Sequence, residues 1–258
     1  MIIDAHTHLG RPGGALDGRA TDLLKSMDAA GIDKALVFAG RLNSISTKEV
    51  LDEIAPYRDR LYGVGSVSVR PRGRNYGRRH WAEVDALLKA GMIRGLKFYP
   101  GYEYFYPADE WLRPFLKKLV KYDRPAIFHS GDTFSKAGGA KLKYAMAIHI
   151  DDLATEMPDL KIIIAHLGYP FQREAGEVVY KNKNVYADCS GLFYGEASIE
   201  EMASTWDEFI RVAGGESKIL FGSDWPISDQ KSYVEVVSKH FNTEHLLSSN
   251  AMKLFGIS

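Results

Sequence analysis

The chain has 258 residues, of which 45% are hydrophobic and 26% are charged, so its composition is that of a globular protein large enough to bury a substantial core. Lysine plus arginine and aspartate plus glutamate each number 33, and the resulting formal charge of zero argues against a basic surface for nucleic acid. The single cysteine, Cys189, excludes an intramolecular disulfide.

Short apolar runs alternate with amphipathic helical stretches along the chain. The apolar runs predict eight strands, at residues 2–6, 34–39, 61–67, 95–99, 126–129, 161–166, 185–189 and 219–223. The amphipathic stretches predict helices at residues 21–30, 47–57, 81–90, 110–122, 148–157, 171–181, 199–213 and 232–240. Eight strand–helix units predict an α/β fold, a (β/α)8 TIM barrel that takes up residues 1–258 as a single domain. A doubly wound open sheet is the alternative, but its Gly-x-Gly-x-x-Gly signature after the first strand is missing.

The first predicted strand closes with the triplet His6-Thr7-His8. Residues i and i+2 of a strand point to the same side, so the two imidazoles converge and can bind one metal ion. Taken alone, the triplet also fits two polar side chains on a half-exposed strand. The rest of the chain decides between these interpretations.

Three further side chains of metal-binding type end predicted strands: His129 the fifth, His166 the sixth and Asp224 the eighth. The carboxyl ends of barrel strands share one rim, the face that carries active sites, so these residues would meet His6 and His8 there. A core histidine bonded to a carbonyl is the alternative for His129 or His166 taken singly, and a helix cap is the alternative for Asp224. Four histidines at three strand ends favour a metal site.

Six segments follow one another in the order known from a family of metal-dependent enzymes. They are Ile3-Asp4-Ala5-His6-Thr7-His8, Gly95-Leu96-Lys97-Phe98-Tyr99-Pro100, His129-Ser130-Gly131, His166-Leu167-Gly168, Gly222-Ser223-Asp224-Trp225-Pro226 and Asn250-Ala251-Met252-Lys253-Leu254-Phe255-Gly256. With them the chain resembles the amidohydrolase superfamily, in particular its amidohydrolase-related branch of small TIM-barrel hydrolases and decarboxylase-like enzymes. The resemblance covers nearly the whole chain, and it implies that the last segment is a closing helix packed on the outside of the barrel.

The resemblance implies that His6, His8, His129 and Asp224 bind a divalent metal, with zinc as the expected ion. His166 would be either a catalytic histidine, in a site with one metal, or a ligand of a second metal. We expect one metal; two remain the alternative.

Lys97 separates these two versions of the site. In binuclear relatives a carboxylated lysine at the end of the fourth strand bridges two ions, and the setting of Lys97 resembles that one. With one metal, Lys97 would be an inward-facing cation paired with Asp4 or with a carboxylate of the substrate.

A zinc ion with an open coordination position lowers the pKa of bound water to about 7 and polarises a carbonyl. Asp224 would take the proton from the attacking water and return it to the leaving group, while His166 would bond to the water or the oxyanion. We therefore expect a metal-dependent hydrolase of an amide, lactone or ester bond in a small cyclic or carboxylated substrate. A metal-dependent decarboxylase of aromatic or enol acids is the first alternative, and an inactive barrel that acts as a binding module is the second.

Substrate contacts are expected in the loops after the strands. The fourth loop is rich in aromatic residues, and four aromatic side chains are candidates for a pocket that accepts a flat or cyclic acid: Tyr99, Tyr102, Tyr194 and Trp225. Packing of these rings onto the barrel rim is the alternative. Arg11 and Arg41, just past the first two strands, are candidates to bind a carboxylate, whereas the basic run at 70–79 is expected to be solvated surface. The segment 131–143 is a candidate lid.

The expected partner is therefore a small-molecule substrate, with neither nucleic acid nor membrane. The amino end has no basic region followed by an apolar stretch, and no apolar run has the length of a bilayer span, so we expect a cytoplasmic protein. A homodimer through the outer helices is an open alternative.

Overall fold

The computed structural model describes residues 1–10, 19–40, 45–67, 76–133, 139–192, 199–241 and 244–258. Its centre is one parallel sheet whose eight strands follow the order of the sequence. They are β1 (Ile3–His8), β2 (Lys34–Phe38), β3 (Leu61–Ser66), β4 (Ile93–Phe98), β5 (Ala126–Phe128), β6 (Ile162–Ile164), β7 (Val185–Asp188) and β8 (Ile219–Leu220).

Backbone hydrogen bonds between β1 and the segment after β8 close the ring. Ala5 N donates to Phe221 O and Asp224 N donates to His6 O, both over 2.8 Å. The predicted TIM barrel is therefore confirmed, and the open doubly wound sheet is excluded.

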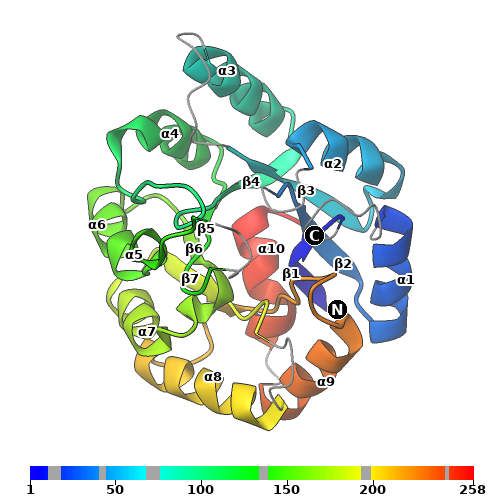
Figure 1. The fold of residues 1–258 in the computed structure, drawn as a ribbon. Helices are drawn as coiled ribbons and strands as arrows, with labels where there is room; N and C mark the ends of the chain where they lie inside the picture. Colours follow the sequence, from blue (N-terminus) through cyan, green and yellow to red (C-terminus); the bar gives the residue numbers. More distant parts are fainter. Residues whose placement is uncertain (11–18, 41–44, 68–75, 134–138, 193–198, 242–243) are drawn as a thin grey trace.

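Helices surround the strands, and all of them but the last lie in a ring around the barrel (Figure 1). They are α1 (Ala20–Ala30), α2 (Thr47–Ile54), α3 (Tyr76–Lys89), α4 (Arg113–Lys121), α5 (Leu142–Ala145), α6 (Ile148–Glu156), α7 (Gln172–Lys181), α8 (Ile199–Ala213), α9 (Gln230–His240) and α10 (Asn250–Phe255), with short turns η1 (Ala55–Tyr57), η2 (Glu110–Leu112), η3 (Ala165–Gly168) and η4 (His245–Ser249). Each predicted helix is present. Local chemistry sets several ends: Ser46 and Glu49 form a capping box at the start of α2, and Gly31, with φ +70°, ends α1.

The last helix does not lie where the sequence predicted it. Figure 1 shows α10 in the middle of the ring rather than on its circumference. Ala251, Leu254 and Phe255 pack against the side chains that fill the barrel interior. These three residues share one helix face, and that apolar face covers the open amino end of the barrel.

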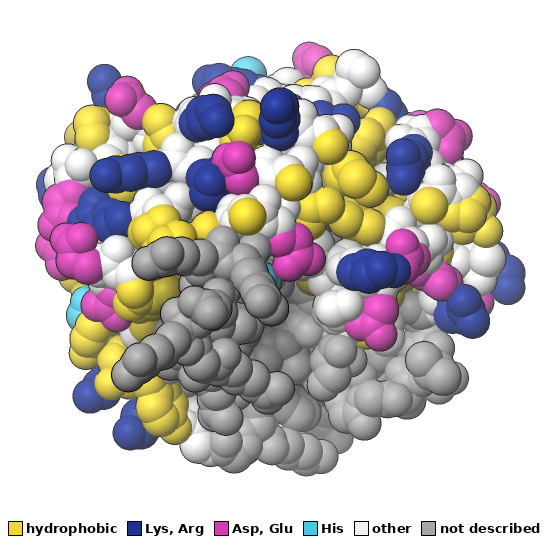
Figure 2. Space-filling view, turned by 90° about the horizontal axis from the view of Figure 1, so that it is seen from above, with side chains coloured by type: hydrophobic (Ala, Val, Ile, Leu, Met, Phe, Trp, Pro, Cys, Tyr) yellow, Lys and Arg dark blue, Asp and Glu magenta, His cyan; other side chains and the backbone are white. Residues whose placement is uncertain are grey.

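The surface shows no separation of charge on the face drawn in Figure 2, where basic and acidic side chains are interspersed over the coloured part. Among the described residues, no helix combines the length and the hydrophobicity that crossing a membrane requires. The predicted metal-binding side chains lie at the carboxyl rim of the barrel, where the strands end.

Candidate metal centre

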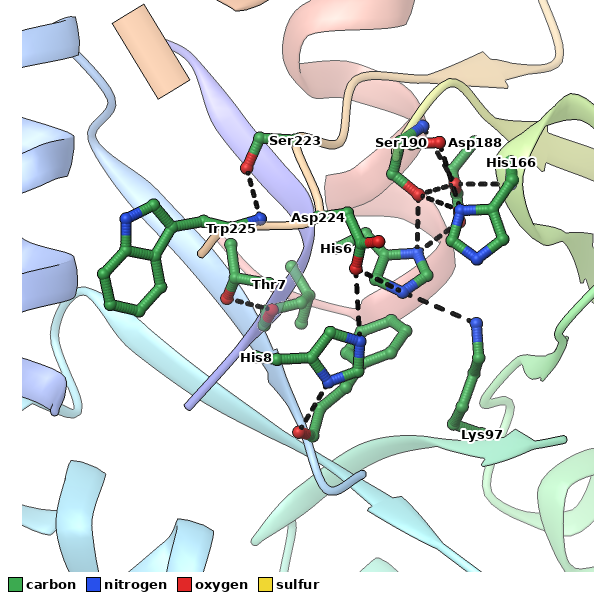
Figure 3. A network of polar contacts seen from close by, with 12 residues as sticks. His6, Thr7, His8, Lys97, His166, Asp188, Ser190, Ser223, Asp224 and Trp225 are labelled. Atoms are coloured by element: carbon green, nitrogen blue, oxygen red, sulfur yellow. Dashed lines mark hydrogen bonds and ion pairs between the residues drawn. The ribbon is translucent and has the colours of Figure 1, made fainter. Parts of the chain in front are cut away.

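The side chains predicted for the metal site meet at this rim. His6 and His8 come from β1, His129 directly follows β5, His166 lies in η3 after β6, and Asp224 follows β8. In Figure 3 the rings of His6, His8 and His166 and the carboxylate of Asp224 point toward one another. Residues more than two hundred positions apart are thus neighbours.

His6, His8 and Asp224 form a group whose ligand atoms all lie within 4.8 Å of one another. Asp224 Oδ1 is 3.3 Å from His8 Nε2 and 3.7 Å from His6 Nε2. Ligand atoms that bind one zinc ion tetrahedrally at roughly 2.1 Å lie about 3.3 to 3.5 Å apart. The group therefore has the size of a metal site.

Hydrogen bonds at Nδ1 fix the tautomers of the two imidazoles, so that each Nε2 atom carries no proton and keeps its lone pair. A carbonyl oxygen only accepts, so His8, whose Nδ1 lies 3.3 Å from Phe38 O, carries its proton on Nδ1. His6 Nδ1 is 2.9 Å from Asp188 Oδ2, and its Nε2 accepts from the Lys97 ammonium at 3.4 Å. Both Nε2 atoms can therefore act as ligands, and the donor set fits a divalent metal.

His129 contributes differently. Its Nε2 lies 2.7 Å from Asp132 O and donates to that carbonyl, so Nδ1 is the nitrogen with a free lone pair. Its ring centroid is 5.0 Å from that of His166 and 4.8 Å from that of Tyr102. The structure places His129 beside the metal group without bringing it into the set of mutually close ligand atoms, and its role as a ligand stays a prediction.

The pKa values of the buried imidazoles also suit metal binding. Burial lowers the pKa of His6 to about 3, and the charge of Lys97 acts in the same direction. Burial lowers the pKa of His166, and holds that of His129 well below its usual range. These three rings are neutral at neutral pH, as metal ligands must be.

The carboxylates are held in the charged form. Burial by itself would raise the pKa of Asp224, but the imidazoles of His8, His6 and His166 around it hold that pKa well below its usual range. Burial likewise opposes ionisation of Asp188, and the electrostatic attraction to His6 outweighs it and lowers that pKa. Both acids are ionised at neutral pH.

Asp188 was missed in the sequence prediction. It ends β7, and with His6 and His166 it forms a second group of mutually close potential ligands. A signal was available, because Asp188 lies at a strand end on the same rim as the predicted ligands. Residue type alone does not single it out, because an aspartate near a strand end is also a common turn residue.

Lys97, from β4, is a buried cation within the site (Figure 3). Its ammonium lies 5.5 Å from the centroid of Phe38 and 5.6 Å from that of Tyr99, and no carboxylate of the described residues forms an ion pair with it. The predicted pairing with Asp4 is wrong. Asp4 accepts hydrogen bonds from Ser223 and Gln230 instead, which ties β1 to the segment after β8.

Replacing Lys97 by methionine should stabilise the metal-free protein at pH 7 by up to about 3 kcal/mol, because burial lowers the Lys97 pKa from 10.5 to about 8. Between about pH 8 and 10.5 Lys97 is protonated in the unfolded chain and neutral in the folded protein. The free energy of unfolding of the wild type therefore rises with pH, and the advantage of the variant disappears. Urea unfolding from pH 7 to 10.5 measures this difference. Lys25→Met, which removes an exposed ion pair with Asp22, is the control. A stability difference between Lys97→Met and the wild type that stays constant over this pH range would contradict a cost of burying the ammonium.

Two segments of the site, the turn after β6 and the turn after β8, contain residues in the left-handed backbone conformation. In these two segments φ is positive at His166 (+60°), Leu167 (+49°) and Asp224 (+63°), a conformation that costs non-glycine residues energy. Such strain persists only where surrounding contacts hold it. Here His166 N donates to Asp188 Oδ1 over 3.0 Å, and Asp224 N is held by His6 O.

Gly191 provides a test of how tightly the site is packed. A Cβ at this position, where φ is +68°, would lie 2.8 Å from Asp224 Oδ2 and 3.0 Å from His166 Nδ1. Gly191→Ala should therefore displace the side chains of Asp224 and His166 and lower zinc affinity by about tenfold or more. The positive φ should also lower the free energy of unfolding by about 1–2 kcal/mol. Chelator competition and thermal unfolding measure the two effects.

Gly31→Ala is the matched control, because Gly31 has φ +70° and open space around the added Cβ. It should lose similar stability and retain zinc affinity. Equal affinity in the two variants would show that Gly191 does not constrain the ligands.

The structure describes three of the predicted substrate-binding residues, Tyr99, Tyr102 and Trp225. Tyr99 donates from its hydroxyl to Ala39 O over 2.9 Å, and the Tyr102 ring lies at a tilted angle, 53°, to that of His129. The indole of Trp225 points away from the imidazoles in Figure 3. The remaining candidates lie outside the described residues: Arg11, Arg41, Tyr194 and, within the candidate lid, 134–138. Their roles stay predictions.

The sequence matches the family model described as Amidohydrolase over residues 3–257. No curated protein matches it. Among solved structures, an uncharacterized TIM-barrel protein from Bordetella bronchiseptica is similar, with 21% sequence identity, a TM-score of 0.78 and coverage of 99% of this chain and 98% of that chain.

Two further similar structures have activities in their names. A probable 2-pyrone-4,6-dicarboxylic acid hydrolase from Acinetobacter baumannii is 17% identical, with a TM-score of 0.71 and 99% of each chain covered. A 2,6-dihydroxybenzoate decarboxylase from Rhizobium is 18% identical, with a TM-score of 0.70 and coverage of 99% of this chain and 98% of that chain. These identities show a common fold alone. The family model spans almost the whole chain, and the protein therefore belongs to the amidohydrolase family.

Proposed function

We propose that this protein is a metal-dependent hydrolase, with one zinc ion, that cleaves an amide, lactone or ester bond in a small cyclic or carboxylated substrate. The observation that carries the proposal is the group of His6, His8 and Asp224, whose unprotonated Nε2 atoms and ionised carboxylate lie at the spacing of metal ligands. His129 is the fourth proposed ligand. A zinc ion bound at such a site supplies Lewis-acid polarisation of a carbonyl and a lowered pKa for water.

Asp224 is the proposed proton acceptor. Its Oδ1 faces the two imidazoles of β1, which leaves Oδ2 to take a proton from the attacking water and to return it to the leaving group. The side chains of His8 and Asp224 are 15% and 10% exposed, whereas that of His6 is fully buried. Substrate is therefore expected to approach from the side of His8 and Asp224.

His166 is the second proposed catalytic residue. Its Nδ1 is 3.1 Å from Ser190 O, a carbonyl that only accepts, so the ring is protonated on Nδ1 and its Nε2 accepts. An accepting nitrogen orients a water molecule through the proton of that water, and it offers nothing to an oxyanion. Of the two tasks predicted for His166, the geometry supports the positioning of water.

A metal-dependent decarboxylase is the second candidate, and Lys97 is compatible with it. A buried ammonium without a carboxylate partner in the described part of the chain is suited to hold a carboxylate that belongs to the substrate. The same contact would serve a carboxylated lactone or amide. Lys97 therefore supports an anionic substrate in either reaction.

Product analysis in ¹⁸O-labelled water separates the candidates. The zinc-loaded protein is incubated with lactones, amides and carboxylated aromatic compounds, and hydrolysis is expected to place one ¹⁸O in the product. Release of carbon dioxide without ¹⁸O incorporation would assign the decarboxylase instead. Metal binding without turnover of any compound would favour the binding module.

The proposal also includes a cytoplasmic location, which cell fractionation tests, and a homodimer, which light scattering tests.

A further inference from the structure

Asp188 and Ser190 form a compact turn at the end of β7. Asp188 Oδ1 accepts from Ser190 N over 3.2 Å and from Ser190 Oγ over 2.5 Å, the pattern of an Asx turn. The same oxygen accepts from His166 N over 3.0 Å. Two of these donors are backbone N–H groups, which cannot accept, so Oδ1 carries no proton.

The other carboxylate oxygen faces a metal ligand. Asp188 Oδ2 lies 2.9 Å from His6 Nδ1. A proton shared between a carboxylate and an imidazole belongs on the nitrogen, because the imidazole is the stronger base. His6 therefore donates from Nδ1, and its Nε2 keeps the lone pair.

The opposite edge of the His6 ring gives independent support. Lys97 Nζ lies 3.4 Å from His6 Nε2, and an ammonium group only donates. Nε2 is therefore the accepting atom of this ring. It is also the atom that faces Asp224 Oδ1.

Hydrogen bonds through Ser190 hold this cluster together. Ser190 Oγ lies 2.9 Å from His6 Nδ1, 3.0 Å from His166 Nδ1 and 2.5 Å from Asp188 Oδ1. The hydroxyl thus lies within hydrogen-bonding distance of all three groups. Its proton goes to Asp188, and its lone pairs face the two imidazoles.

We propose that Asp188 is a positioning residue that fixes the tautomer of His6, so that metal binding by His6, His8 and Asp224 depends on a carboxylate that does not touch the metal. The inference rests on the proposed function, because metal binding can depend on Asp188 only if His6, His8 and Asp224 bind a metal. Outer carboxylates that orient metal-binding histidines commonly contribute about 10- to 100-fold to metal affinity.

Asp188→Asn tests the proposal with almost no change of shape. The amide oxygen is expected to take the place of Oδ1, which has three donors to satisfy, so the amide nitrogen faces His6 and donates to Nδ1. His6 must then carry its proton on Nε2, where it blocks the metal. An asparagine in the corresponding place of the serine-protease triad also leaves its histidine in the wrong tautomer.

The readout is the tautomer of each histidine, from long-range ¹H–¹⁵N spectra of the metal-free, histidine-labelled full chain. In the wild type, His6 should be protonated on Nδ1. In Asp188→Asn, His6 should change to Nε2–H while His8, bonded to Phe38 O, stays unchanged. Chelator competition should show zinc affinity about 10- to 100-fold weaker.

Ser190→Ala is the matched control. It removes the hydroxyl, but Asp188 still faces His6 and the backbone carbonyl of residue 190 still faces His166. His6 and His166 should therefore both stay protonated on Nδ1 in this variant.

Three results would overturn the proposal: a wild-type His6 protonated on Nε2, an Asp188→Asn variant that keeps both the His6 tautomer and zinc affinity, or one that loses zinc with the tautomer unchanged. If the asparagine variant does not fold, the wild-type spectrum still decides. A wild type that binds no zinc would remove the proposed function, while the spectrum tests the tautomer separately.

Discussion

Asp224→Asn is expected to abolish turnover while the barrel stays folded. The amide cannot accept the proton of the attacking water, and loss of a positioned general base alone reduces the rate by about 10²- to 10⁴-fold. The variant also removes the negative ligand atom that lies 3.3 Å from His8 Nε2. Steady-state kinetics on the substrate found in the product analysis, together with the melting temperature, measure both consequences.

Asp229→Asn is the control for this prediction. Asp229 is exposed on the same connection between β8 and α9, where it caps the helix by accepting from Ser232 N over 2.8 Å. Asparagine caps helices as well as aspartate does, so activity and stability should be retained. Near-normal turnover in Asp224→Asn would refute the assignment of Asp224 as proton acceptor.

His6→Ala is expected to reduce the metal content and to weaken zinc affinity by at least about tenfold, since a ligand contributes no less to affinity than the outer residues that orient it. His6 lies at the centre of the site: it is fully buried, stacks on Phe38 with ring centroids 4.3 Å apart, and belongs to both groups of potential ligands. Elemental analysis after purification measures metal per chain, and chelator competition measures affinity.

His245→Ala provides the comparison, because His245 is an exposed histidine in η4 that bonds to Ser249. Its metal content should equal that of the wild type. Unchanged occupancy in His6→Ala would mean that the metal binds elsewhere in the chain.

The sequence was sufficient for the barrel because alternation of apolar strands and amphipathic helices is a local pattern. It was less reliable at strand ends. The eighth strand was predicted to reach residue 223, but β8 ends at Leu220, and the chain then turns through the left-handed conformation at Asp224. Single backbone bonds to β1 replace regular pairing there, and no local pattern indicates them.

Polar partners at the site were harder to predict than the ligands. The histidines and Asp224 stand out because metal-binding residue types end strands, whereas the partners of Asp4 depend on how the ring closes. Ser223 and Gln230 are more than two hundred residues away and reach Asp4 only because β8 returns beside β1. Asp188 depends in the same way on β7 lying beside β6 and near β1, through contacts with His166 and His6.

The central claim, that the rim is a metal site, is tested most directly by elemental analysis of the full chain purified without chelator or added metal. The account predicts about one zinc ion per chain, bound by His6, His8 and Asp224 with His129. About two ions would instead point to a Lys97 that is carboxylated and bridges them. No metal, even after exposure of the protein to zinc or manganese, would contradict the metal-dependent function.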